Sequence, residues 1–275
     1  MLVVIHKPRL ELREFVDRFW FYEGLSPIHK LERVLPDGTF TLCINLRSEP
    51  RHIYERGSHR PVASYRHAWF SGAHRRHIVI DTGRDSSMMG AHFKVGGTAC
   101  VLGMPAGELL DQVVELDALG RLADANLRDA LLEAPSPEAK FNVLEDFLLC
   151  QARRNGARKP ALHHAVNSLT NAPNTASISA LATELGISHK HLIEQFRDEV
   201  GLTPKRFCRI QRFQEVLRAI EARRGVEWAD IACACGYFDQ AHFIHEFHEF
   251  SGLNPSAYLA QRGEYLNFVP VGERG

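Results

Sequence analysis

Two short stretches near the C-terminus carry side chains that can hydrogen-bond to the edges of nucleic-acid bases. Gln240 can pair with adenine, Lys190 and Arg197 suit guanine or phosphate, and Ala241 can touch a thymine methyl. These side chains remain exposed once the apolar stripe of each stretch is assigned to a core. The base-reading candidates are therefore His189, Lys190, Ile193, Glu194, Arg197, Gln240, Ala241, His242, Ile244 and His245.

The two stretches belong to a pattern that occurs twice, offset by about fifty residues. The first copy reads Leu192, Phe196, Gly201, Leu202, Pro204 and Phe207. The second copy reads Phe243, Phe247, Gly252, Leu253, Pro255 and Tyr258. Upstream of each lies a matching pair of segments: Leu181, Ala182 and Gly186, then Ile231, Ala232 and Gly236. Such a repeat indicates one supersecondary unit used twice.

Each copy predicts a helix, a tight turn and a second helix. Gly186 and Gly236 suit the left-handed conformation at a helix end, and Ser188 and Asp239 suit the N-cap of the next helix. An ordinary helical hairpin would explain one such copy. Two matched copies favour a helix-turn-helix, whose second helix enters the DNA major groove.

A long helix is predicted between the copies. Thr203 is a suitable cap, Pro204 suits the first helical position, and no further Pro or Gly occurs through Ala222. Such a helix spans about 28 Å, whereas adjacent major grooves on one DNA face lie about 34 Å apart. A rigid helix of this length can hold two reading helices one turn of DNA apart. Asn254 and Pro255 repeat the cap for a closing helix.

Residues from about 161 to 262 resemble the DNA-binding domain of the AraC/XylS transcription regulators. The resemblance lies in IxxLATELGISHKHLIEQFRDEVGLTPKRF, in the linking helix and in DIACACGYFDQAHFIHEFHEFSGLNPSAYL. It implies that exposed positions early in each recognition helix meet base edges, which selects the same ten candidates. Glu194 and His245 depart from the pattern, because many members have Arg or Gln at the first position and Arg at the second.

Three basic residues just after the first recognition helix are candidate phosphate contacts: Lys205, Arg206 and Arg209. A solvated helix face would explain them equally well. Between residues 161 and 262, ten Lys and Arg face eleven Asp and Glu. Because phosphate contacts supply much of the affinity for DNA, we expect modest binding by one protomer, helped by histidine protonation, paired sites or other proteins at the promoter.

The first 150 residues predict a β-rich region backed by helices. A turn at Asp37 and Gly38 precedes an alternating segment typical of a strand at 39–46. Further strands are expected at 68–71, 77–81 and 88–93. Helices are expected at 99–102, 105–110, 116–132 and 138–150.

This half resembles a domain often fused to the AraC/XylS DNA-binding unit. The matching pieces are LPDGTFTLCINL, MMGAHFKVGGTACVLGMPAGEL and LDQVVELDALGR, with Val95 where relatives commonly have Pro. The resemblance implies a sensory or dimerising role. The residues that we expect near a ligand pocket are Arg33, Asp37, Asn45, Trp69, His92 and Lys94. A role at turn and strand ends is the favoured explanation for Asp37 and Asn45.

Other classes of protein find less support. Lys plus Arg and Asp plus Glu number 33 each, so composition alone does not indicate DNA binding. The histidines of the first half would suit a metal-binding barrel, but no H-x-H pair with a following carboxylate and no H-E-x-x-H helix occurs. A zinc-bound alkyl-repair module would need more cysteines than Cys43 and Cys100 there. The six cysteines read as buried free thiols in a reducing cytoplasm, and no apolar run could span a membrane.

The sequence thus predicts an α+β fold with a β-rich N-terminal domain with helices at 1–150 and a linker at 151–160. An all-α DNA-binding domain of two helix-turn-helix units joined by a long helix follows at 161–262, with a tail at 263–275. We expect a cytoplasmic regulator that binds double-stranded DNA, is no enzyme and holds no cofactor or metal. RNA polymerase, a small-molecule effector and a second copy are open partners, and a membrane is not expected. A metal-binding barrel enzyme and an interaction protein with a vestigial helix-turn-helix remain the alternatives.

Overall fold

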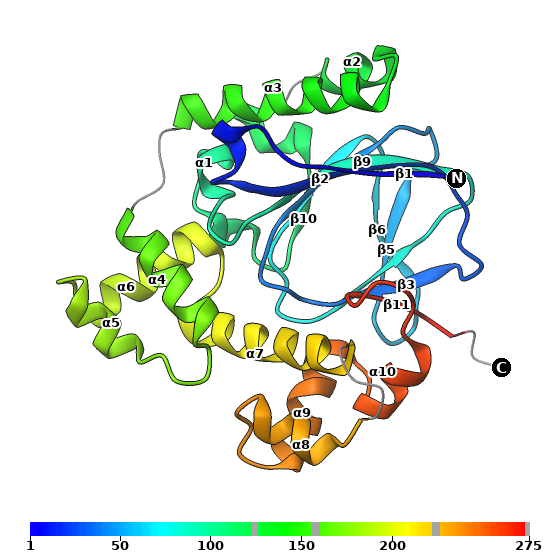
Figure 1. The fold of residues 1–275 in the computed structure, drawn as a ribbon. Helices are drawn as coiled ribbons and strands as arrows, with labels where there is room; N and C mark the ends of the chain where they lie inside the picture. Colours follow the sequence, from blue (N-terminus) through cyan, green and yellow to red (C-terminus); the bar gives the residue numbers. More distant parts are fainter. Residues whose placement is uncertain (123–125, 156–159, 222–225, 273–275) are drawn as a thin grey trace.

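The computed structural model describes residues 1–122, 126–155, 160–221 and 226–272. A β-rich N-terminal part is followed by a helical C-terminal part, which confirms the predicted α+β class (Figure 1). The two parts pack against each other, and their buried side chains form one contiguous hydrophobic cluster.

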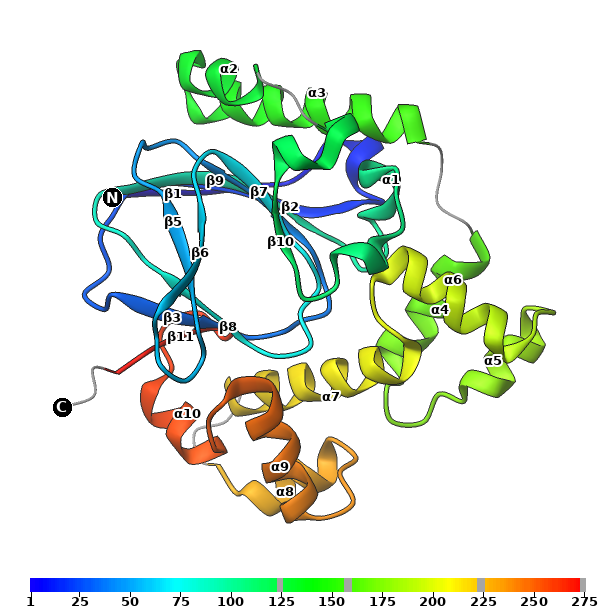
Figure 2. The same cartoon turned by 180° about the vertical axis from the view of Figure 1, so that it is seen from behind.

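Two antiparallel sheets face each other in the N-terminal part (Figure 2). The first has the order β1 (Leu2–His6), β2 (Val16–Leu25), β9 (Ser86–Phe93), β4 (Thr41–Asn45), β7 (Ala68–Ser71) and β10 (Val113–Glu115). The second has the order β11 (Phe268–Pro270), β3 (Leu31–Val34), β8 (Ile78–Asp81), β5 (Arg51–Tyr54) and β6 (Pro61–Tyr65). The predicted strands correspond to β4, β7, β8 and β9, which alternate or are largely apolar.

Strand β11 comes from the segment predicted as a C-terminal tail. It pairs with β3, with Phe268 opposite Val34 and Val269 opposite Arg33. Val269 is fully buried, so the end of the chain completes the edge of the N-terminal sheet.

Helical segments cover the outside of the first sheet and one end of the barrel-like pair of sheets (Figure 1). They are η1 (Leu10–Leu12), α1 (Ala99–Leu102), η2 (Ala106–Leu109), η3 (Leu116–Leu122), α2 (Leu127–Glu133) and α3 (Pro137–Asn155). Phe141 of α3 stacks on His6 at a centroid distance of 4.7 Å and lies 6.3 Å from Phe19. Helix α3 continues through Asn155, into the segment predicted as a linker; residues 156–159 of that segment lie outside the described residues.

The described residues of the C-terminal part form helices, apart from β11. They are α4 (Pro160–Asn171), α5 (Ile178–Glu184), α6 (His189–Val200), α7 (Pro204–Glu221), α8 (Trp228–Ala234), α9 (Gln240–Ser251) and α10 (Pro255–Gln261). Helices α5 and α6 form the first predicted helix-turn-helix, and α8 and α9 form the second. Helix α7 joins them; Ala222, where we expected it to end, lies outside the described residues.

Local capping explains why these helices begin and end where they do. The side chains of Ser188 and Asp239 accept hydrogen bonds from His191 N and His242 N, which confirms both predicted N-caps. Gly201 and Gly252 end α6 and α9 in the left-handed conformation, which costs glycine little. The repeat therefore encodes its own helix boundaries.

The six cysteines, all among the described residues, form no disulfide bond, but they are not all buried. Cys100 and Cys235 are buried, whereas Cys150 and Cys233 are exposed. Cys233 lies on the outer face of α8, one residue beyond the buried Ala232, so the prediction of a core position was wrong for it.

Candidate nucleic-acid interface

The base-reading candidates lie on α6 and α9, the second helices of the two units. His189, Lys190, Glu194 and Arg197 are exposed on α6, while Ile193 is half-buried. On α9 the exposed candidates are Gln240, Ala241, Ile244 and His245. His242 is half-buried beside the ring of Tyr237, with the two ring centroids 5.4 Å apart.

The structure separates Arg197 from the other candidates on α6. Arg197 lies in the last turn, whereas His189 and Lys190 lie in the first. A Cβ placed on Gly107 of η2 would lie only 3.1 Å from Arg197 Cγ, so this arginine packs against the N-terminal part. Lys190 Nζ is 3.7 Å from the carboxylate of Glu194, and this pair leaves the α6 surface close to neutral.

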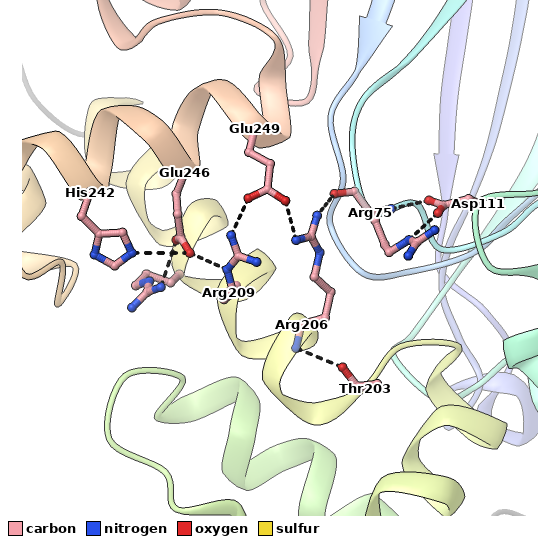
Figure 3. A network of polar contacts seen from close by, with 9 residues as sticks. Arg75, Asp111, Thr203, Arg206, Arg209, His242, Glu246 and Glu249 are labelled. Carbon is pink, nitrogen blue, oxygen red and sulfur yellow. Dashed lines mark hydrogen bonds and ion pairs between the residues drawn. The ribbon is translucent and has the colours of Figure 1, made fainter.

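Two of the three phosphate candidates take part in a network of ion pairs between α7 and α9 (Figure 3). Arg206 Nη1 donates to Glu249 Oε1 at 2.6 Å. Arg209 donates to Glu246 Oε1 and to Glu249 Oε2, each at 2.5 Å. Lys205, the third candidate, is exposed. In this arrangement the guanidinium groups of Arg206 and Arg209 join two helices, and Lys205 alone of the three projects to solvent.

Glu246 is the buried centre of this network, with a side chain only 3% exposed. It also accepts from Arg212 Nη2 at 2.9 Å, and the Arg212 guanidinium lies 4.5 Å from the centroid of the Tyr237 ring. Burial raises the pKa of Glu249, but hydrogen bonds from Arg206 and Arg209 outweigh it and the net pKa is lowered. Both helices are therefore locked together by charge-assisted hydrogen bonds.

Sequence reasoning missed Glu246 and Glu249 because it treated the basic residues of α7 alone. A signal was present. Arg206, Arg209 and Arg212 recur every three residues on α7, and the two glutamates are three apart on α9. Residues three apart lie on one helix face, so two faces of opposite charge could have been matched.

The loop between β7 and β8 connects the N-terminal part to this network. Arg206 Nη2 donates to the carbonyl oxygen of Arg75 at 2.5 Å, and Figure 3 shows Arg75 in turn paired with Asp111. The amide of His77 donates to Phe250 O, at the end of α9, at 2.8 Å. The second helix-turn-helix unit is thus attached directly to the N-terminal part.

A second attachment lies along α7, where two glutamines meet the turn before β4. Gln211 Nε2 donates to Asp37 O at 2.9 Å, and Gln214 Nε2 donates to Pro36 O at 2.8 Å. A Cβ on Gly38, whose φ is +83°, would lie 3.2 Å from the ring of Phe207. The joining helix therefore packs directly on the N-terminal part.

The six residues expected near a ligand pocket are not gathered at one site. Asp37 and His92 do meet, with Asp37 Oδ2 3.3 Å from His92 Nε2. Burial raises the pKa of Asp37, but hydrogen bonds from His92 and Thr39 bring it to about 2. Asn45 Nδ2 donates to the carbonyl groups of Glu49 and Arg66, which is a strand-end role.

The other expected pocket residues are spread over the sheets. Arg33 Nη1 lies 3.5 Å from Pro270 O, Trp69 on β7 packs against Tyr65 on β6, and Lys94 is exposed. A surface cavity of about 530 Å³ opens instead between β6 and β10, where its walls include Tyr54, Val62, Tyr65, His74 and Asp111. None of the six expected residues lines it.

Two histidines in the β7–β8 loop should make the protein sensitive to mild acid. Burial lowers the pKa of His74 and of His77 to about 4, below the ordinary value near 6.5. Between these pH values the unfolded chain binds protons that the folded chain does not, so stability falls as the pH falls. We expect a loss of up to about 3 kcal/mol per histidine by pH 4, complete stability returning above pH 6.5.

Urea unfolding of the wild type and of His77→Gln at pH 7.5, 5.5 and 4.5 measures this effect. The variant should show a shallower dependence on pH than the wild type. Equal slopes for the two proteins would mean that the folded-state pKa of His77 is close to its ordinary value.

No group of three or more His, Cys, Asp or Glu side chains that could hold a metal ion occurs within residues 1–122, 126–155, 160–221 and 226–272. Among the helices of these same ranges, none combines the length and apolar character needed to cross a bilayer.

Comparison with known proteins agrees with the two helix-turn-helix units. Residues 181–261 match the family model of a helix-turn-helix domain, and residues 5–115 match a domain of unknown function (DUF6597). The HTH-type transcriptional activator RhaS of Pectobacterium atrosepticum is 26% identical over 152 residues, which are 53% of this chain and 52% of RhaS. The chain thus spans about half the length of the curated relatives that it matches.

Two solved structures are similar at lower identity. ToxT from Vibrio cholerae is 10% identical with a TM-score of 0.46, over 88% of this chain and 98% of ToxT. An AraC-type DNA-binding domain-containing regulator from Chromobacterium violaceum is 22% identical with a TM-score of 0.35, over 38% of this chain and 94% of that one. The repeated helix-turn-helix in the structure agrees with the matches to the helix-turn-helix model and to RhaS, and residues 181–261 are similar to the helix-turn-helix domain of transcriptional regulators of this type.

Proposed function

We propose that this protein is a sequence-specific DNA-binding transcription regulator whose α6 and α9 read two successive major-groove segments. The observation that carries the proposal is the pair of capped reading helices at either end of α7, an 18-residue helix. Such a helix is about 27 Å long, close to the spacing of about 34 Å between grooves on one face of DNA. The base-reading residues keep the roles that we expect from the sequence, except that Arg197 packs beside Gly107.

The N-terminal part is proposed to bias the reading helices toward or away from the geometry that fits DNA. Its contacts support this role, because the Pro36–Gly38 turn holds α7 and the Arg75–His77 segment holds α7 and the end of α9. A small molecule or a second copy could bias the state only by binding the two arrangements unequally. RNA polymerase is a further proposed partner at the promoter. The support for it is that the RhaS relative is named as a transcriptional activator.

An interaction protein with a vestigial helix-turn-helix is the competing proposal. It is favoured by the balance of ten basic and eleven acidic residues between 161 and 262 and by the internal pairing of Arg206 and Arg209. Selection of genomic fragments by the full-length protein, followed by footprinting at two salt concentrations, separates the two. Protection of two segments about one helical turn apart supports the regulator. Weak, sequence-blind binding that disappears with salt supports the interaction protein.

Replacing Gln240 with alanine should relax the choice of base in the segment that α9 contacts. Gln240 is exposed at the first position of α9 and can bond adenine through two hydrogen bonds. We expect discrimination at one base pair to fall by about 5- to 150-fold, which corresponds to 1–3 kcal/mol. Binding to a set of single-base variants of the selected site measures it.

His248→Ala is the matched control, since His248 is exposed on the last turn of the same helix. It should leave base preference unchanged. If Gln240→Ala also leaves affinity and preference unchanged, α9 is not the reading helix.

A further inference from the structure

Phe238 is the most exposed aromatic side chain among the described residues. It is 92% exposed and lies in the turn between α8 and α9, immediately before the N-cap residue Asp239. Burial of an apolar side chain of this size is favourable. In an isolated protomer the Phe238 ring stays in solvent at the start of the proposed reading helix and gains nothing from burial.

The turn that carries Phe238 is one residue longer than the corresponding turn of the first unit. One residue, Ile187, separates Gly186 from the cap Ser188, whereas two, Tyr237 and Phe238, separate Gly236 from Asp239. The amide of Ile187 donates to Ala182 O at 3.0 Å, and that of Tyr237 donates to Ala232 O at 2.9 Å. These two residues are therefore equivalent, and Phe238 is the inserted one.

The core position beneath the turn between α8 and α9 is already occupied by another side chain. Tyr237 is buried, with its ring 5.4 Å from the ring of Phe243 and the Arg212 guanidinium 4.5 Å from its centroid. Ile187 likewise packs against the hydrophobic core in the first unit. The insertion thus adds nothing to the core, and its side chain extends into solvent beside the N-terminus of α9.

The surroundings of Phe238 favour a base over the DNA backbone as its contact. Its neighbour Asp239 is a carboxylate, which repels phosphate, and its cap hydrogen bond to His242 N keeps it beside the turn. Gln240 and Ala241, the next two residues, are exposed candidates for base edges. The major groove offers one apolar feature to such a side chain, which is the C5-methyl group of thymine.

We propose that Phe238 packs on a thymine methyl at the edge of the major-groove segment contacted by α9, and so selects thymine at one position. The inference rests on the proposed function, because it needs α9 to enter the groove. It adds an apolar specificity contact to the polar candidates Gln240 and His242.

The test replaces each thymine of the protected segment, one at a time, with deoxyuridine, which lacks only the methyl group. The selected site from the footprinting experiment serves as the probe, with full-length protein. Wild type should lose affinity about four-fold at one thymine, the factor expected for one buried methyl group. Phe238→Ala should bind the unmodified site about ten-fold more weakly and should show no loss for deoxyuridine at that position.

Two controls separate this contact from a change in folding or in partner binding. Because Phe238 is 92% exposed, Phe238→Ala should unfold at the wild-type urea midpoint. Phe268→Ala removes another exposed aromatic, on strand β11 of the N-terminal sheet, and should keep the full penalty for deoxyuridine.

Equal deoxyuridine penalties in wild type and Phe238→Ala would overturn the inference. So would a variant that binds the site normally but activates or represses transcription less, because the ring would then serve a protein partner. If wild type itself shows no sequence-selective binding, the proposed function fails and this inference falls with it.

Discussion

Replacing Glu246 with glutamine is expected to lower the free energy of unfolding by about 3 kcal/mol, within the range of 3–5 kcal/mol for breaking a buried ion pair. The Glu246 side chain is 3% exposed and accepts hydrogen bonds from Arg209 and Arg212. Glutamine keeps the size of the side chain but removes its charge and presents an amide N–H₂ to a guanidinium. Arg209 retains Glu249 as a partner and some access to water, so we expect the lower end of the range.

Glu194→Gln is the matched control for this measurement. Glu194 lies on α6 and pairs with Lys190 at 3.7 Å, but the two side chains are 57% and 86% exposed. Exposed pairs contribute about 0–1 kcal/mol, so this variant should unfold close to the wild type in urea. A loss for Glu246→Gln no larger than that of the control would mean that the network does not stabilise the fold.

The ion pairs between α7 and α9 also explain why the numbers of basic and acidic residues say little about the charge that is available to bind DNA. Arg206, Arg209 and Arg212 count as three basic residues in the sequence, but ion pairs with Glu246 and Glu249 offset two of the three charges in the fold. Fewer cations are then available for phosphate, so binding to the selected site should depend on salt less steeply than the number of Lys and Arg suggests. Under the proposed function, base contacts from α6 and α9 would then supply a correspondingly larger share of the affinity.

The helix-turn-helix units could be predicted from the sequence because their determinants are local. The caps Ser188 and Asp239 bond to amides three residues away, and the left-handed glycines act within their own turns. Hydrophobic spacing of three and four residues placed α6 and α9 correctly. Because the pattern occurs twice, the helix boundaries predicted in one copy could be checked against those in the other.

The parts that could not be predicted depend on residues far apart in the chain. Strand β11 forms because Phe268 pairs with Val34, and three residues with no long alternation give no sign of this. Strand β1 has more than half of its side chains exposed, so its pattern resembles that of a loop. The ion pairs between α7 and α9 require the crossing of two helices, which periodicity does not determine. The exposure of Phe238 depends on the fold of the turn before α9, which its residue type does not indicate.

The contact between the end of α9 and the N-terminal part allows a sharper test of how the two parts are coupled. Gly252 has a φ of +71°, and a Cβ there would lie 2.4 Å from His77 Cε1. His77 cannot easily move aside, because it is buried and its amide bonds to Phe250 O. Gly252→Ala should therefore carry two costs: about 1–2 kcal/mol for the left-handed backbone and about 1–3 kcal/mol for overpacking against His77.

Gly186→Ala separates these two costs, because Gly186 has a φ of +66° and a Cβ added there would meet no atom within 4 Å. It should show the backbone cost alone in urea unfolding. The double variant Gly252→Ala with His77→Ala removes the clashing ring, and its loss should be smaller than the sum of the two single losses by about 1–3 kcal/mol. A strictly additive double variant, or a Gly252→Ala variant no less stable than Gly186→Ala, would show that His77 does not hold the end of α9. A coupling of the expected size would instead mean that a change at His77 in the β7–β8 loop is transmitted to α9, because His77 contacts Gly252 and Phe250 at the end of that helix.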